Sequence, residues 1–199
     1  MKKYKMLKHD KINLDGTTLY RIKACKEFKT ITGRIIHKGE KGGYIEKESN
    51  LSQEGSCWVS DNAWVFEDAE VYENAVVYED AVVNGTAVVN GTAVVYGNAC
   101  VCEFAQVHNE TAIYGNAVVS GNAYISGKSC IFDNARIFDF AEINNSYILG
   151  NAWIGGTVKV YNGASVYGEN CFCGNEQISG YINIIELQIS QKDEPDICD

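Results

Sequence analysis

Residues 74–101 read NAVVYEDAVVNGTAVVNGTAVVYGNACV, in which a small residue, an arbitrary residue and an aliphatic residue are followed by a short polar segment. The aliphatic residue returns every six positions. Fourteen consecutive spacings of six join Val59 to Ile143, one spacing of five leads to Ile148, and six further spacings of six end at Ile184. Such fixed self-similarity is the signature of a repeat fold.

The small residue stands two positions before the aliphatic one, as Ala75 before Val77 and Ala93 before Val95. Residues two apart point to the same side of a strand, so we expect both to face inward and their neighbours to face outward. The intervening pairs, such as Glu-Asp, Gly-Thr and Gly-Asn, form turns. A hairpin meander requires neither a strict period nor a small residue at one inward position. Parallel coiling around a narrow core explains both.

Three stretches carry a family resemblance: DGTTLYRIKACKEF (15–28), GGYIEKESNLSQEGSCWVSDNAWV (42–65), and the YGNA and SGNA units. Through them nearly the whole chain resembles the hexapeptide-repeat left-handed β-helix, and more closely the YdcK-like proteins of the trimeric LpxA-like superfamily. The resemblance implies an all-β fold, a single-stranded left-handed parallel β-helix with three hexapeptides in each triangular coil. About eight coils stacked about 4.8 Å apart would give a rod on the order of 40 Å long.

We expect three segments along the chain. Residues 1–42 are predicted to form a small N-terminal β-hairpin cap, with Asp15-Gly16 as its turn, and residues 43–184 the hexapeptide-repeat solenoid. A cap covers the open sheet edge that a terminal coil would otherwise present. Residues 185–199 are interpreted as a C-terminal strand remnant and an acidic tail.

Composition limits the functions to consider. The first 47 residues hold 13 of the 17 Lys and Arg residues and 5 of the 26 Asp and Glu residues, which leaves a net charge of +8 there and −17 in the remainder. No apolar run is long enough to span a membrane, and no apolar segment of signal-peptide length follows the first lysines. We therefore expect a cytoplasmic protein with reduced cysteines, no cofactor and no membrane contact.

Outward residues sort onto three faces when every third repeat is taken. One face combines an aromatic with an aliphatic series and is predicted to be exposed and to form an interface, with a second copy or with a protein partner: Val76, Tyr78, Val94, Tyr96, Ala112, Tyr114, Cys130, Phe132, Tyr147 and Tyr167. Monomers seldom expose a continuous apolar face larger than a few hundred Å2. The alternative is that stacked aromatics only stiffen the sheet.

Acyl transfer is the main enzymatic alternative, because the resemblance implies a superfamily rich in acyltransferases that use a histidine base. His108 is the single solenoid histidine and the one weak catalytic candidate. The unbroken spacing leaves no loop to enclose it, and one histidine cannot supply the three metal ligands of the superfamily's carbonic anhydrases. We therefore favour a non-catalytic binding or scaffold protein.

Two further groups of residues are weaker candidates. The pairs Cys100/Cys102 and Cys171/Cys173 each offer two soft metal ligands where a structural zinc site needs four, and we expect their thiols to lie too far apart for an unstrained disulfide. An acidic patch could imitate a nucleic acid and make the protein an inhibitor of a nucleic-acid-binding protein, for instance one encoded by a phage: Glu67, Asp68, Glu70, Glu73, Glu79 and Asp80. Direct nucleic-acid binding is not expected.

Overall fold

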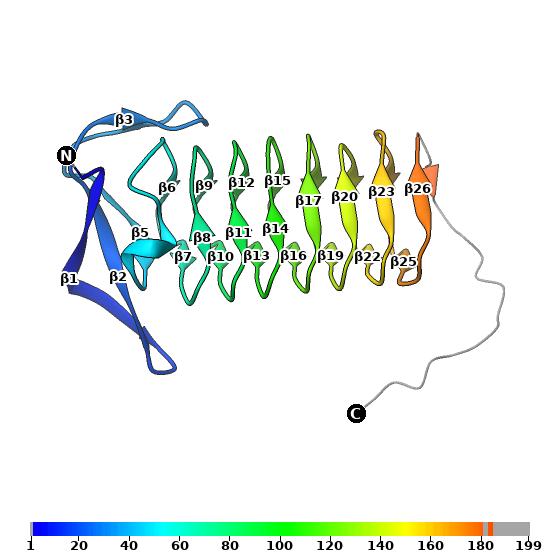
Figure 1. The fold of residues 1–199 in the computed structure, drawn as a ribbon, viewed down its shortest axis with the longest axis horizontal. Coiled ribbons are helices and arrows are strands. Elements are labelled where there is room, and N and C mark those ends of the chain that lie inside the picture. Colours follow the sequence, from blue (N-terminus) through cyan, green and yellow to red (C-terminus); the bar gives the residue numbers. More distant parts are fainter. Residues whose placement is uncertain (1, 181–182, 185–199) are drawn as a thin grey trace.

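The computed structural model describes residues 2–180 and 183–184 and is an all-β solenoid of about eight turns (Figure 1). Its coils lie side by side along one axis, which confirms the fold class expected from the sequence. The described residues contain one short helical turn, η1 (Glu48–Asn50). The tail expected over 185–199 lies outside the described residues.

Three sheets form the walls of the solenoid, and from β6 onward each strand pairs in parallel with the strand three positions later in the chain. The first sheet consists of β1 (Tyr4–Leu14), β2 (Thr17–Ala24), β5 (Lys41–Ile45), β7 (Trp64–Val65), β10 (Val82–Val83), β13 (Cys100–Val101), β16 (Val118–Val119), β19 (Arg136–Ile137), β22 (Trp153–Ile154) and β25 (Cys171–Phe172). The second, called the aromatic sheet below, consists of β6 (Trp58–Val59), β9 (Val76–Val77), β12 (Val94–Val95), β15 (Ala112–Ile113), β18 (Cys130–Ile131), β21 (Tyr147–Ile148), β24 (Ser165–Val166) and β27 (Asn183–Ile184). The third consists of β8 (Glu70–Val71), β11 (Val88–Val89), β14 (Gln106–Val107), β17 (Tyr124–Ser126), β20 (Glu142–Asn144), β23 (Lys159–Tyr161) and β26 (Gln177–Ser179).

The core is the narrow interior that these walls enclose. The repeating aliphatic residues and the small residues two positions before them are buried; Val77, Val95 and Ala93, for example, are fully inaccessible. Alanine keeps the walls close together where the chain bends, and the aliphatic residue fills the centre. The inward assignment made from the period of six is therefore confirmed.

A left-handed backbone conformation recurs at every corner. From residue 61 to residue 168 the corners carry one residue with positive φ each, as at Glu79 (φ 59°) and Gly97 (φ 72°), except the corner of Asn162 and Gly163, which carries two; all are Gly, Asn, Asp or Glu. Glycine and asparagine tolerate this region readily, so their spacing follows from the backbone. The one spacing of five is taken up at the corner of Asn145, and the ladder continues with Cys130 opposite Tyr147.

The N-terminal residues extend one wall and cover another. The β1–β2 hairpin turns at Asp15-Gly16 as expected and continues the first sheet through antiparallel pairing of β2 with β5. A second, short hairpin, β3 (Phe28–Lys29) and β4 (Ile35–Ile36), lies beside the first coils (Figure 1). Its contact with the aromatic sheet was not anticipated from the sequence.

Candidate interaction surface

Four aromatic rings form a stacked column on the aromatic sheet. Tyr78, Tyr96, Tyr114 and Phe132 follow one another with 4.9 Å between neighbouring ring centroids and interplanar angles of 4°, 9° and 1°. The parallel register fixes this arrangement, because Val76, Val94 and Ala112 lie opposite one another in the ladder. The four residues predicted to share one wall do share it, and their rings are half-buried.

The aliphatic series beside the column is less exposed than predicted. Val94, Ala112 and Cys130 are half-buried, but Val76 is buried, with 4% of its surface accessible. The prediction that Val76 is exposed is therefore wrong. Trp58 in the preceding coil and the β3–β4 hairpin lie over this end of the sheet. Tyr147, further along the same wall, is exposed, and Tyr167 is half-buried.

Partial burial makes the column's phenols harder to ionise. It raises the pKa of Tyr78 to about 12 and also raises the pKa of Tyr96 and of Tyr114, and in each case desolvation is the main cause. For Tyr78 the neighbouring Tyr96 and the carboxylates of Glu79 and Asp61 add to the rise. The column is thus a neutral surface at physiological pH.

The raised pKa of Tyr78 has a consequence for stability at alkaline pH. The folded state favours the neutral phenol, so the stabilisation is complete below pH 10.0, the ordinary pKa, and is lost as the pH rises toward about 12. We expect Tyr78→Phe to lose less unfolding free energy across this interval than the wild type, measured by urea denaturation at several pH values. Tyr147→Phe, which alters an exposed ring, should behave like the wild type; an equal change in both variants would contradict the assignment.

Three of the six carboxylates of the predicted acidic patch bind backbone N–H groups. At three successive corners Glu67, Glu73 and Glu79 accept hydrogen bonds from the backbone N–H of the glycine 18 residues later, at 2.6, 2.8 and 2.8 Å. Each bond satisfies a corner N–H in the next coil.

The remaining three acids of the patch differ from one another. Asp68 pairs with Lys47 Nζ at 2.6 Å, and Asp80 accepts a hydrogen bond from the Asn62 amide at 3.2 Å. Glu70 is exposed. Five of the six carboxylates therefore have a contact within the protein that accounts for their presence.

His108 lies half-buried on the third sheet. Its Nδ1 is 2.7 Å from Asn90 Oδ1 and its Nε2 is 3.2 Å from Gln106 Oε1, and its ring lies 5.0 Å from that of Tyr124. Burial lowers the pKa of the imidazole. Each ring nitrogen thus lies beside an amide oxygen, and the single N–H of the neutral imidazole donates to one of them, which suits a fixed position in the wall.

The paired cysteines lie closer together than predicted. Cys171 Sγ is 3.0 Å from Cys173 Sγ, so the expectation that such thiols stand apart is wrong. The second cysteine of each pair is at a corner, where the strand ends and the side chains converge. A contact between Cys100 and Cys102 lowers the pKa of Cys100 and raises that of Cys102. Over the described part of the chain, no group of three or more His, Cys, Asp or Glu residues could hold a metal ion.

One buried polar pair was missed from the sequence. Lys3 is fully buried, and its Nζ donates to Cys57 Sγ and to the backbone oxygen of Glu54, both at 3.0 Å. Burial lowers the pKa of Lys3 and raises that of the Cys57 thiol. Together with the hydroxyl of Tyr4, which donates to Leu51 O at 2.6 Å, the pair fastens β1 to the first coil. Only the burial of an N-terminal lysine could have signalled this, and burial is not visible in the sequence.

Comparison with known proteins adds no family assignment. No protein-family model matches the chain, and no curated protein matches it. Within the described residues no helix is both long enough and apolar enough to cross a membrane. The site must therefore be interpreted from its own geometry.

Proposed function

We propose that this protein is a non-catalytic β-solenoid that binds a protein through the aromatic sheet. The observation that carries the proposal is the unbroken column of Tyr78, Tyr96, Tyr114 and Phe132, four half-buried rings held in register on one wall. Aromatic side chains are enriched in protein interfaces because they bury a large apolar area at little cost in side-chain entropy. The stacked rings of the aromatic sheet provide such an apolar area directly on the wall of the solenoid, without a loop or a cofactor.

A second copy of the chain is the simplest occupant. Two identical walls that meet about a two-fold axis present the same patch to each other, as in most homodimers. The column is flat and neutral, so two copies can approach each other here without repulsion between like charges. The corner acids next to it are held by backbone N–H groups, as Glu79 is by Gly97. We also place the chain, as part of this proposal, among the YdcK-like hexapeptide-repeat proteins, on the strength of the period of six and the solenoid of about eight turns.

Sedimentation velocity at micromolar protein tests self-association. We expect Tyr96→Asp to weaken it by roughly 30-fold, the effect of losing a central residue worth about 2 kcal/mol, because a charge then stands in the middle of the column. Tyr161→Asp is the matched control, since Tyr161 takes the same position in the third sheet. Circular dichroism should show both variants folded.

Two results would overturn the self-association. One is a wild-type protein that sediments as a monomer at every concentration tested. The other is equal dissociation by Tyr161→Asp and Tyr96→Asp, which would place the contact away from the aromatic sheet.

A further inference from the structure

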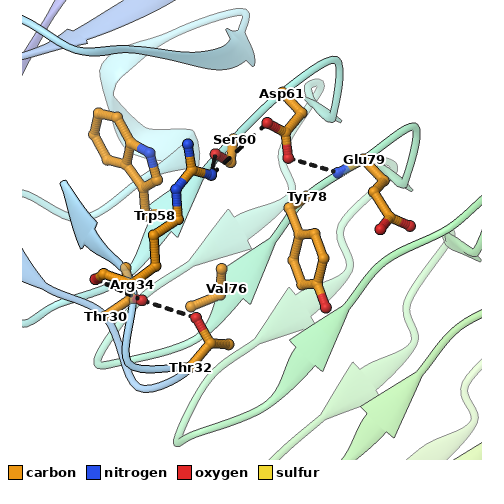
Figure 2. A pocket seen from close by; sticks show the side chains of 9 residues that line it. All are labelled: Thr30, Thr32, Arg34, Trp58, Ser60, Asp61, Val76, Tyr78 and Glu79. Atoms are coloured by element: carbon orange, nitrogen blue, oxygen red, sulfur yellow. Dashed lines mark hydrogen bonds and ion pairs between the residues drawn. The ribbon is translucent and has the colours of Figure 1, made fainter.

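A cavity opens where the column meets the N-terminal hairpin. It has a volume of about 330 Å3 and lies between the loop that joins β3 to β4 and the strands β6 and β9 (Figure 2). Its lining consists of Thr30, Thr32, Arg34, Trp58, Ser60, Asp61, Val76, Tyr78 and Glu79. The volume corresponds to roughly ten water molecules at about 30 Å3 each, which is enough for a single ring.

The cavity occupies the place of a missing ring in the column. Ser60 precedes Tyr78 by one coil, and its backbone N–H donates to Val77 O just as Tyr78 N–H donates to Val95 O. Serine therefore stands where the next aromatic residue would stand. Among the described residues the ring of Tyr78 stacks only on Tyr96, so its other face is turned toward this space.

An unpartnered donor borders the same space. Trp58 is fully buried, and its indole Nε1–H has no hydrogen-bond partner. Figure 2 shows the edge of the indole that carries Nε1 turned toward Arg34, inside the lining of the cavity. Buried donors are nearly always satisfied, so an orphaned indole N–H indicates a missing acceptor.

The charged groups of the lining are already matched. The guanidinium of Arg34 donates to Ser60 Oγ at 2.5 Å and to Glu40 Oε1 at 2.9 Å, and it lies 3.7 Å from Asp61 Oδ1. Glu79 accepts from Gly97 N–H, and Asp61 accepts from Glu79 N–H at 3.3 Å. The lining holds one cation and two carboxylates, and Glu40 outside the lining also pairs with that cation, so an anionic ligand would be repelled.

We propose that this cavity binds an uncharged planar ring with an acceptor oxygen, of the phenol type, as the missing member of the column. The ring stacks on the free face of Tyr78, and its oxygen accepts the hydrogen bond of Trp58 Nε1. Val76 supplies an apolar floor, and the guanidinium of Arg34 favours an electron-rich ring nearby. The proposal does not depend on what covers the rest of the aromatic sheet.

The indole N–H of Trp58 reports binding directly. The chain has 3 Trp residues, so a nitrogen-15 correlation spectrum shows few indole signals, and the one lost in Trp58→Phe is that of Trp58. We expect p-cresol to move this signal downfield saturably. Toluene has the same shape without the oxygen; we expect it to bind about fivefold to tenfold more weakly and to cause no downfield shift, which is the effect of one lost hydrogen bond.

A pair of variants locates the stacking contact. Tyr78→Leu should weaken p-cresol binding at least tenfold, whereas Tyr114→Leu, which alters the same column away from the cavity, should leave it unchanged. The proposal is overturned if p-cresol moves no indole signal, if toluene binds equally well, or if both leucine variants weaken binding equally.

Two sources of the ring can be told apart with the same signal. Competition by N-acetyltyrosinamide at an affinity equal to that of p-cresol would assign the cavity to a tyrosine side chain of another protein. Binding of p-cresol with exclusion of the amino-acid amide would assign it to a free phenolic compound. Either result supports the ring site.

Discussion

Val95→Asp is expected to leave the protein unfolded at room temperature. Val95 is fully buried in the narrow interior, and no cation lies among the alanine and aliphatic residues around it. A carboxyl group there must either be buried without a partner or be protonated against its ordinary pKa. With the lost burial of the valine, the cost is at least about 5 kcal/mol, comparable to the whole stability of a small domain.

Val94→Asp is the matched control, because Val94 precedes Val95 on β12 and points outward. It should fold, with a loss of about 1 kcal/mol or less. Circular dichroism and urea denaturation of the two variants measure the difference. If both variants fold equally well, alternate residues do not face opposite sides of the wall and the solenoid described above is wrong.

Gly42→Ala is expected to cost about 3 kcal/mol or more, the second large effect. Gly42 lies in β5 at the junction of the hairpins with the first coil. A methyl group there would collide with the backbone oxygen of Val59 and stand 2.7 Å from both Ile22 and the Trp58 ring. The Val59 backbone and the packed Ile22 and Trp58 side chains cannot all move away from the methyl group, so it strains the junction.

Gly174→Ala provides the comparison in the last described coils. A methyl group at Gly174 would meet only the carboxylate of Glu176, 3.1 Å away at the end of a flexible side chain. We expect a change of less than about 1 kcal/mol in the free energy of unfolding. Thermal denaturation of both variants decides the matter: similar melting temperatures would mean that β5 does not pack as tightly as described.

The walls of this molecule were predicted from the period of the sequence together with its family resemblance. A period of six with a small residue at one fixed place determines which residues turn inward. That three such units make one coil, and therefore which outward residues share a wall, was implied by the resemblance to the hexapeptide-repeat β-helix. The alignment of Tyr78 with Tyr96 and Tyr114 followed from this period together with the three units per coil that the resemblance implied. These features are local and repetitive, so the same pattern can be recognised in every coil.

The cavity beside Tyr78 could not be predicted in the same way. It depends on where the β3–β4 hairpin lies, and that position is set by contacts such as that between Phe28 and Trp58, whose rings are 5.4 Å apart and 30 residues apart in the chain. No periodic pattern connects these residues. The sequence held a single signal: Ser60 takes the position one coil before Tyr78, where another aromatic residue would have extended the column.

The acidic residues show how a compositional argument can miss a local cause. A run of Glu and Asp suggested a surface potential, but Glu73 and its equivalents stand at left-handed corners and satisfy a glycine N–H in the next coil. Glycine, asparagine, aspartate and glutamate share these corners, where the backbone has a positive φ. The spacing of 18 between acid and glycine was visible in the sequence.

The equal coils make the length of this molecule adjustable in discrete increments. A coil of 18 residues begins and ends at the same corner, and its ladder partners lie directly above and below it. Excising one such unit between Tyr78 and Phe132 would bring equivalent residues back into register and shorten the wall by about 4.8 Å. The number of repeats therefore determines the length of the solenoid in steps of about 4.8 Å.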